Sequence, residues 1–433
     1  MMRPLISYYG DDFTGSTDVM EALASNGVET VLFLEVPDAE LLSRFAHARA
    51  FGLAGTSRSE TPDWMEVHLE AAFGWLKTLD AELCHYKVCS TFDSAPHVGN
   101  IGRAIEIGWR VFGAATVPLI VGAPQIRRYT AFGDLFAAYQ GRNYRIDRHP
   151  VMARHPVTPM DEANLLLHLS RQTRLSSALL DNVALLDRPE PEAADILLID
   201  VLDRATQVAA GALLWNRLRE KSGFVCGSSG VEYALIPTWR EEGLIGERPD
   251  FAAAGPVGRI AVVSGSVSPT TERQIRHALR DGFGGVTLDP LALSAVENES
   301  VIAAAVEAGI AVLQGGQSVV LHTALGPAAD RGGELDSSNG ARHRLGRALG
   351  SILSQLVAKA GLSRAVVAGG DTSSHALGEM GIAALTLKMP LPQTPGSPLC
   401  IAHGGAADGL QIALKGGQVG GDDYFSMIRA GKA

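Results

Sequence analysis

Cysteine is scarce in this sequence, and no long apolar run occurs. Four cysteines among 433 residues do not support a disulfide framework and are typical of a reducing compartment. No apolar run reaches the roughly 18 to 20 residues that a membrane-spanning helix needs. The segment MMRPLISYYGDDF contains two aspartates before the apolar core of a signal peptide could form. These absences predict a cytoplasmic protein that has no membrane partner.

An excess of positive charge is also missing. Lys and Arg number 37 against 47 for Asp and Glu, so the formal net charge is −10. This balance argues against a general nucleic-acid binder, whose binding surface is normally basic. Hydrophobic residues make up 46% and charged residues 19% of the chain, which supports buried cores and is unlike a disordered chain. We therefore expect a soluble globular protein.

The standard motifs of several enzyme classes are absent. No GxxxxGK[ST] stretch supports a P-loop, and no GxGxxG follows a strand to open a Rossmann dinucleotide site. GxSxG and HExxH are missing too, which weakens the case for a hydrolase or a metalloprotease. The sequence instead contains a set of glycine-rich turns that follow apolar segments.

Short apolar segments alternate with segments of helical period along the chain. This alternation predicts an α/β fold with two αβ domains, each a mainly parallel sheet flanked by helices. Gly, Pro and small residues interrupt the alternation at 241–258, so we expect a linker there between domains 1–240 and 259–433. The clearest helical patterns cover 63–79, 161–173, 203–221 and a long stretch near 340–360.

The first turn that carries chemistry is YYGDDFTGSTDVMEAL (8–23). Asp11 and Asp12 stand where an apolar strand ends and a helix begins, which is where open α/β sheets bind ligands. Thr14 and Gly15 would expose backbone N–H groups that suit an anionic group. One aspartate could accept a proton from a substrate hydroxyl while the other orders the loop or a cation. A helix cap plus a charged turn residue explains the two aspartates equally well.

Cations and hydroxyls follow another strand of the first half. Lys87 precedes Cys89-Ser90-Thr91-Phe92-Asp93-Ser94, and an ammonium beside several hydroxyls could bind a carboxylate or a phosphate. Further along, Arg127, Arg128 and the arginines at 142, 145 and 148 make a locally basic region in an acidic protein. A site for two anions would need such cations, although a solvated surface explains the same residues.

Three glycine-rich segments in the second half, at 262–269, 366–381 and 413–425, each follow or end an apolar strand. Permissive backbone, N–H donors and a cation are the parts that hold a polyphosphate. Turn formation explains any one of these segments, but three in one domain favour a phosphate or nucleotide site. The candidate nucleotide-binding residues are Ser264, Gly265, Ser266, Gly369, Gly370, Asp371, Thr372, Lys415, Gly416 and Gly417.

Together these segments resemble the four-carbon acid sugar kinases. GDDFTGSTD (10–18) resembles the DDFTG signature of that family, and AGGDTSSHAL (368–377) resembles its GGDT segment. The other segments occur in a similar order: KVCSTFDS, GNIG, HPVTPMDEANL, DVLDRATQ, CGSSGVEYAL, SGSVSPTTERQI and KGGQVGGDDYF. The likeness extends over nearly the whole chain. It implies an N-terminal domain that binds a sugar acid and a C-terminal domain that binds ATP.

The resemblance also implies a reaction, the ATP-dependent phosphorylation of a hydroxyl on a short acid such as threonate, erythronate or 3-oxo-tetronate. By motif match, Asp11, Asp12, Thr14 and Gly15 fall at the substrate loop. Many members read STLRGN after the lysine, where this chain has a segment that carries Asp93 instead of an arginine. The chain therefore looks closer to a branch that acts on 3-oxo-isoapionate, a branched five-carbon acid.

We expect direct in-line transfer from ATP, which depends mainly on positioning and on neutralising charge. Asp12 is the expected general base or hydroxyl orienter and Asp11 its support, while Lys87 and Arg127 or Arg128 hold the acid group. Mg²⁺ is expected because it bridges phosphates and offsets the repulsion between two anionic ligands, and the sequence assigns it no ligands. Closure of the two domains would exclude water.

Two other classes remain open at this point. An NAD(P)-dependent oxidoreductase is disfavoured by the missing dinucleotide motif. A non-enzymatic sugar-acid-binding protein also has two αβ lobes but would not need the GGDT segment. The expected partners are a small sugar acid and ATP. A homo-oligomer is compatible with the sequence, which does not fix the oligomeric state, the acid or the phosphorylated hydroxyl.

Overall fold

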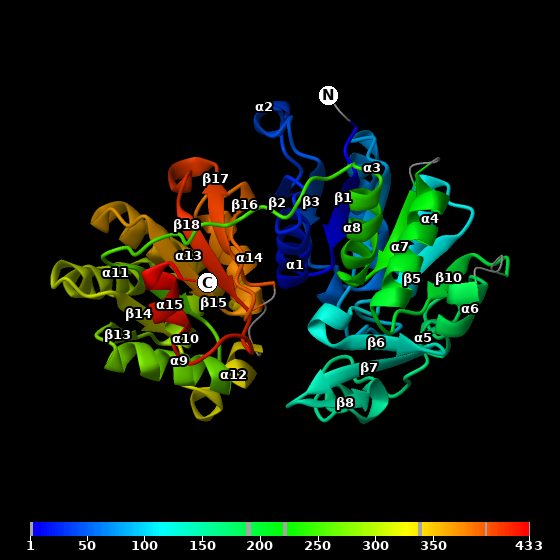
Figure 1. Ribbon diagram of the computed structural model, residues 1–433. Coiled ribbons are helices and arrows are strands. Elements are labelled where there is room, and N and C mark those ends of the chain that lie inside the picture. The colour runs from blue at the N-terminus through cyan, green and yellow to red at the C-terminus, as the bar shows by residue number, and fades with distance from the viewer. Residues whose placement is uncertain (1–2, 188–191, 220–222, 337–339, 395, 433) are drawn as a thin grey trace. The chain divides into compact units, whose positions relative to one another are not determined.

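The chain divides into two compact units (Figure 1). The computed structural model describes residues 3–187, 192–219, 223–336, 340–394 and 396–432, without the side chains of Asp336, Asp371, Thr372 and Ser374. Unit 1 comprises residues 1–31 and 36–249, and unit 2 comprises residues 32–35 and 250–433.

Unit 1 contains a parallel sheet. Every neighbouring pair of its strands is parallel, as expected where helical crossovers join successive strands. Gly10, Lys87 and Gly227 are in register at the carboxyl ends of their strands. The strand order is β3 (Ala50–Ala54), β1 (Ile6–Gly10), β4 (Leu83–Lys87), β11 (Gly223–Gly227), β5 (Val117–Ile120), β10 (Ile196–Ile199) and β9 (Ser177–Leu180).

Helices pack against this sheet and against each other. α1 (Phe13–Ala24) packs on β1 and β3 and against α8 (Gly230–Glu241), which packs on α7 (Arg204–Leu218). α3 (Pro62–Thr78) and α4 (Ile101–Phe112) pack together against β1, β4 and β11. The sequence marks where they begin: Thr61 caps α3 ahead of Pro62, and Asp203 forms a capping box with Thr206 on α7. The shorter helices are α2 (Ala39–Arg44), α5 (Leu165–Leu169) and α6 (Asn182–Asp187).

A small antiparallel sheet also belongs to unit 1. It consists of β6 (Arg128–Ala131), β7 (Asp134–Tyr139) and β8 (Arg142–Arg145). Two-residue turns, Phe132-Gly133 and Gln140-Gly141, join the strands, and all four residues have positive φ. Such turns match the right-handed twist of paired strands. The arginines of the basic region predicted from the sequence thus lie on and beside a β-hairpin sheet.

Unit 2 has a mixed sheet with a parallel core. The pairs among its first five strands are parallel, and the last two strands pair antiparallel. Ser264, Ala368 and Lys415 are in register at the carboxyl ends of their strands. The order is β13 (Gly284–Thr287), β14 (Val319–His322), β12 (Ala261–Ser264), β15 (Arg364–Ala368), β18 (Gln411–Lys415), β17 (Leu399–His403) and β16 (Ala384–Met389).

The apolar core of unit 2 lies between this sheet and its helices. Ile275 of α9 (Pro269–Arg280) and Phe425 of α15 (Tyr424–Ala430) share a buried cluster with Val262 and Val366 of the sheet. α13 (Ala341–Ala360) packs on β12 and β15 and against α11 (Glu299–Gln314) and α14 (Gly370–Glu379). The remaining helices are α10 (Pro290–Ser294) and α12 (Gly332–Asp336).

A short N-terminal segment completes unit 2. Residues 32–35 belong to it although they precede it in the chain by more than two hundred positions. Leu32 and Phe33, at the end of β2 (Thr30–Phe33), pair antiparallel with Leu385 and Ala384 of β16. The Leu34 N–H continues this pairing by donating to the Ala383 carbonyl at 3.0 Å.

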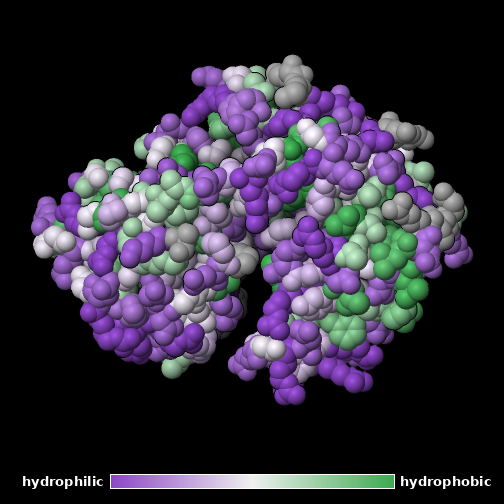
Figure 2. All heavy atoms as spheres, viewed as in Figure 1, coloured by the Kyte–Doolittle hydropathy of each residue, from purple (hydrophilic) through white to green (hydrophobic). Residues whose placement is uncertain are grey.

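The described helices include none that is both long enough and apolar enough to cross a bilayer. Hydrophilic side chains cover most of the face shown in Figure 2, and apolar ones gather over α7 and its surroundings. Exposed residues on and near the helices there include Val183, Leu186 and Leu202.

The predicted fold class is confirmed, since each unit is a mainly parallel sheet flanked by helices. The helix predicted over 161–173 is too long, because the structure contains only Leu165–Leu169 there. Asn164 caps its beginning, and the chain then turns so that the Gln172 side chain accepts a hydrogen bond from the Ile101 N–H at 2.8 Å. Gln172 therefore serves the beginning of α4 instead of continuing α5.

Two helical glycines provide a test of this packing. A Cβ atom at Gly211 on α7 would collide with the backbone of Ala234 on α8, whereas a Cβ at Gly74 on α3 would meet open space. We expect Gly211→Ala to destabilise the protein by about 1–3 kcal/mol and Gly74→Ala to stabilise it by up to about 1 kcal/mol. Scanning calorimetry of both variants measures the difference. Equal melting temperatures would contradict the close contact between α7 and α8.

Candidate active site

Acidic and basic side chains meet at the carboxyl edge of the unit 1 sheet. Asp11 and Asp12 follow β1, Arg58 follows β3, and Lys87 ends β4. Main-chain hydrogen bonds fix this arrangement, because the Asp11 N–H donates to the Lys87 carbonyl at 2.9 Å and the Arg58 N–H to the Asp11 carbonyl at 3.0 Å. This edge is where parallel α/β sheets bind ligands.

Arg58 joins the two aspartates. Its guanidinium donates to both carboxylate oxygens of Asp11, at 2.7 and 3.1 Å, and to Asp12 Oδ2 at 2.7 Å. Burial raises the pKa of Asp11, and the charge of Arg58 opposes this effect. Burial disfavours the charge of Arg58, but the two carboxylates outweigh that and raise the pKa of Arg58 above its ordinary value. The three groups form one partly buried charge cluster.

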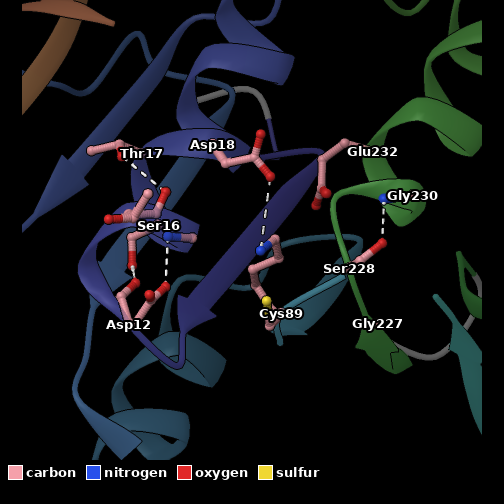
Figure 3. A network of polar contacts seen from close by, with 12 residues as sticks. Asp12, Ser16, Thr17, Asp18, Cys89, Gly227, Ser228, Gly230 and Glu232 are labelled. Atoms are coloured by element: carbon pink, nitrogen blue, oxygen red, sulfur yellow. Dashed lines mark hydrogen bonds and ion pairs between the residues drawn. The ribbon is translucent and has the colours of Figure 1, made fainter. Parts of the chain in front are cut away.

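Asp12 also caps α1. Its Oδ1 accepts a hydrogen bond from the Gly15 N–H at 2.6 Å (Figure 3). A Cβ atom at Gly15 would lie 2.6 Å from that oxygen and 3.0 Å from Lys87 Nζ, so the close approach requires glycine. Thr14 lies in the same turn and its carbonyl accepts from the Thr17 hydroxyl at 3.0 Å. Asp12 therefore caps α1 and also belongs to the acidic site. The two explanations of Asp12 from the sequence, a helix cap and a catalytic carboxylate, do not exclude each other.

Lys87 is buried, and its ammonium hydrogens are available for hydrogen bonds. Its residue is 3% exposed, and Nζ forms an ion pair with Asp18 at 3.8 Å, beyond hydrogen-bond distance (Figure 3). Within the described ranges no side-chain or backbone oxygen accepts a hydrogen bond from Nζ. An ammonium in this state can bind an anionic group that enters beside it.

Asp93 is an ionised and nearly buried neighbour of this edge. Its two oxygens accept from the hydroxyls of Thr91, at 2.5 Å, and Thr158, at 3.1 Å. Burial acts to raise the pKa of Asp93, but Arg58 and the two hydroxyls outweigh it and lower that pKa. The carboxylate keeps lone pairs for additional donors.

The structure separates the two adjacent arginines. Arg127 is exposed and donates to the Gly141 carbonyl at 3.1 Å in the hairpin sheet. Arg128 is half-buried, and burial lowers its pKa although the nearby Cys89 opposes this effect. Its Nε has no acceptor among the described residues. Since Cys89 also interacts with the charges of Arg58 and Lys87, Arg128 lies within reach of the charges at this edge, whereas Arg127 is exposed on the hairpin sheet.

A cavity of about 310 Å³ lies at the carboxyl edge of the unit 2 sheet. Five of the predicted nucleotide residues line it: Gly265, Ser266, Gly369, Gly370 and Gly417. They come together because the Gly265 N–H donates to the Ala368 carbonyl at 3.1 Å and the Gly369 N–H to the Lys415 carbonyl at 2.9 Å. Gly369 has a φ of +130°, which a residue with a side chain rarely adopts. Backbone amides and the beginnings of α9 and α14 thus surround a space suited to an anion.

Other predicted residues lie behind this cavity or outside the description. Ser264 is buried and its Oγ accepts from the Ser266 N–H at 3.4 Å. Lys415 is buried behind the turn that it precedes, and the Gly416 N–H donates to Ser397 Oγ at 3.4 Å. The side chains of Asp371 and Thr372 lie outside the described part of the structure.

The residues present fit a magnesium ion only together with a bound nucleotide. Within the described ranges, no group of three His, Cys, Asp or Glu side chains could hold a metal ion. Asp330 does line the cavity, where its Oδ1 accepts from the Gly332 N–H at 2.7 Å. Because Mg²⁺ is commonly held by one or two carboxylates, water and substrate phosphates, Asp330 is a suitable protein ligand.

Comparison with known proteins identifies the family. The sugar-binding N-terminal domain family matches residues 6–235, and the nucleotide-binding C-terminal domain family matches residues 261–425. The chain is 45% identical to a 3-oxo-isoapionate kinase of Paraburkholderia graminis, over 99% of this chain and 94% of that protein. It belongs to the four-carbon acid sugar kinase family. The predictions of family and of an ATP-dependent sugar-acid kinase are thereby confirmed, against the oxidoreductase and the non-enzymatic binding protein.

A further relative is also a sugar-acid kinase, and two solved structures have the same fold. A 3-oxo-tetronate kinase of Cupriavidus necator is 30% identical, over 98% of this chain and 96% of that protein. Two solved structures share the fold: a putative tRNA synthase of Salmonella typhimurium, with a TM-score of 0.77 and 24% identity over 98% of each chain, and a Haemophilus influenzae protein, with a TM-score of 0.72 and 23% identity over 98% of this chain and 99% of that one.

The kinase contains charged site residues that the sequence analysis missed. Arg58 is one, and its position three residues beyond the glycine that follows an apolar strand, in GTSRS, was an available signal. Arg331 and Arg342 line the unit 2 cavity, and Arg331 pairs with Glu334 at 2.8 Å. These arginines stand on loops and helix ends, where no period in the sequence relates them to the glycine-rich turns.

Replacement of Arg58 tests whether the charge cluster serves the sugar acid. Arg58→Lys keeps the charge but cannot hold two carboxylates through a planar fork, so we expect kcat/KM for the sugar acid to fall roughly 10- to 100-fold. The dissociation constant for ATP should not change. Arg110→Lys, at an exposed ion pair on α4, is the control and should retain normal kinetics. Normal kinetics in Arg58→Lys would remove the cluster from the site.

Proposed function

We propose that this kinase transfers the γ-phosphoryl group of ATP to a hydroxyl of 3-oxo-isoapionate. The observation that carries the proposal is the 45% identity with a 3-oxo-isoapionate kinase over nearly the full length of both chains. Asp93 supports it in two ways. Its negative charge disfavours the carboxylate of the substrate at this position, and its oxygens can accept hydrogen bonds from the hydroxyls of a branched acid. The second candidate substrate is 3-oxo-tetronate, which the 30% identity with a 3-oxo-tetronate kinase favours.

In this proposal the acidic edge of unit 1 handles the acceptor. Asp12 orients the reacting hydroxyl or accepts its proton, and Arg58 holds Asp11 and Asp12 in place. Lys87 and Arg128 bind the carboxylate of the acid, since both are partly or fully buried and carry donors that other described residues leave open. Gly15 and Thr14 give the turn its shape. Arg127, predicted from the sequence as an alternative to Arg128, is less suitable because it is exposed on the hairpin side.

The cavity of unit 2 holds the nucleotide in this proposal. Amides of the turns at 264–266, 369–372 and 416–417 bind the phosphates, and Arg331 and Arg342 neutralise part of their charge. When bound with the nucleotide, Mg²⁺ supplies charge neutralisation between the phosphates and a fixed geometry for them, with Asp330 as a protein ligand. Transfer depends mainly on positioning, so fixed backbone donors suffice.

We also propose the wider setting. Residues 1–240 act as the sugar-acid domain, 241–258 as the linker and 259–433 as the nucleotide domain. Four free thiols suit the cytoplasmic location expected from the sequence. A homo-oligomer stays a prediction.

Asp12→Asn tests the role of Asp12. The amide keeps an oxygen that can cap α1, but it cannot accept the hydroxyl proton, so we expect sugar-acid-dependent ADP formation to fall by roughly 10²-fold or more. ATP binding, measured by calorimetry, should stay unchanged. Near-normal turnover would remove Asp12 from this role.

Gly370→Val is the reciprocal control for that variant. Gly370 lines the cavity and a Cβ there meets open space, so a larger side chain should fill the nucleotide space without disturbing the fold. It should weaken ATP binding and leave binding of the sugar acid unchanged.

A substrate comparison tests the proposed acceptor. We expect kcat/KM in a coupled ADP-release assay to be at least roughly tenfold higher for 3-oxo-isoapionate than for 3-oxo-tetronate, threonate or erythronate, since misfitted polar groups are costly in a buried site. A preference for 3-oxo-tetronate would select the second candidate. ATP turnover with none of these acids would contradict the proposed substrate class.

A further inference from the structure

Lys415 is buried among oxygen atoms at the end of β18. It is 0% exposed, and Nζ donates to Thr271 Oγ1 at 2.9 Å, to the Gly416 carbonyl at 2.8 Å and to the Gly417 carbonyl at 3.3 Å. All three ammonium hydrogens are therefore in use. Lys415 is not among the residues that line the cavity, although Gly417 is. A direct contact between this lysine and a phosphate would require it to give up bonds that hold the turn.

Thr271 connects Lys415 to the cavity. Its hydroxyl lies 3.0 Å from Ser266 Oγ and 3.2 Å from the Gly417 carbonyl. Ser266 lines the cavity, and its Oγ also accepts from the Ser268 N–H at 3.3 Å. A chain of hydrogen bonds thus runs from the buried ammonium through one threonine to a serine on the cavity wall.

The donors and acceptors of this chain favour one direction. A charged ammonium can only donate, so Thr271 Oγ1 accepts from Lys415. The hydrogen of Thr271 has two acceptors within reach, Ser266 Oγ at 3.0 Å and the Gly417 carbonyl at 3.2 Å. We assign it to Ser266 Oγ, because that contact is the shorter one and the carbonyl also receives a hydrogen from Lys415. Ser266 then accepts from Thr271 and from the Ser268 N–H, and its own hydrogen is free to point into the cavity. An anion in the cavity would favour this direction further.

We propose that Lys415 is a positioning residue for the nucleotide: it fixes the turn at Gly416 and Gly417 and, through Thr271, directs the Ser266 hydroxyl toward a phosphate oxygen. The proposal rests on the proposed function, in which this cavity binds ATP. It differs from the role expected from the sequence, where the lysine itself belongs to the phosphate cradle.

The environment of Lys415 makes its charge sensitive to pH. Burial lowers the pKa of Lys415 to about 8. On α9, Glu272 pairs with Arg276, and Arg273 pairs with Asp422 of the loop after β18. The neighbouring strands β15 and β17 present Ala368 and Leu399 at this end. On α14, the side chain of Asp371 lies outside the description. As pH rises through about 8, the ammonium loses a donor and KM for ATP should rise.

Lys415→Met in the full-length chain tests the proposal. The variant keeps an unbranched apolar stem but removes all three donors, so we expect KM for ATP and the dissociation constant of MgADP to rise roughly tenfold. KM for the sugar acid should stay within about twofold of the wild type. The rise in KM for ATP above pH 8 should disappear in this variant. Lys359→Met, which removes an exposed lysine from α13, is the control and should change nothing.

Two more variants decide whether Lys415 acts through Ser266. Thr271→Val removes the connecting hydroxyl and should raise KM for ATP as well. Ser266→Ala combined with Lys415→Met should bind MgADP no more weakly than the weaker single variant, because both changes remove the same hydrogen bond. If Lys415→Met fails to fold, KM for ATP in Thr271→Val and its dependence on pH in the wild type still test the role of Lys415.

The outcomes distinguish this inference from the proposed function. Unchanged KM for ATP in Lys415→Met or Thr271→Val, or full additivity of Lys415→Met and Ser266→Ala, would overturn the inference while the wild type still binds MgADP. A wild-type protein that bound no MgADP would overturn the proposed function, and the inference with it.

Discussion

Main-chain pairing between parallel strands determines which residues meet in each unit. In unit 1 it aligns the ends of β1, β4 and β11, so that acidic turns and a buried lysine from distant parts of the chain lie at one edge. In unit 2 it aligns the ends of β12, β15 and β18 and brings three glycine-rich turns around one cavity. Each edge also opens onto the beginnings of helices, whose amide groups favour negative charge. The same principle therefore builds, in each unit, an edge that is suited to an anion.

The sequence predicted those parts of the fold that depend on local pattern. The helices expected over 63–79 and near 340–360 occur as Pro62–Thr78 and Ala341–Ala360, because apolar period, caps and prolines are all short-range signals. The glycine-rich turns lie where strands end, as expected. The sheet β6–β7–β8 was missed, since its turns begin with Phe132 and Gln140 where Asn or Asp is the usual signal.

The parts of the site that depend on strand order could not be predicted. Arg58 reaches Asp11 and Asp12 only because β3 lies beside β1, and nothing near Arg58 in the sequence specifies that neighbour. The same holds for Arg331 and Arg342, which approach the glycine-rich turns through tertiary packing. The sequence does not show burial either: Lys415 was predicted as a cation of the phosphate site, yet the residue is 0% exposed. Which of the predicted residues perform the chemistry stays a prediction.

Unit 2 is not continuous in sequence, and this affects how it can be handled. Leu32 and Phe33 pair with the outer strand β16, so a fragment that begins after residue 249 would lack them. In that fragment β16 would expose unpaired amides and carbonyls next to Leu385, and such an edge pairs readily with other molecules. A separately expressed nucleotide-binding half should therefore include a grafted copy of residues 32–35. Without that copy, we expect self-association to limit its soluble yield.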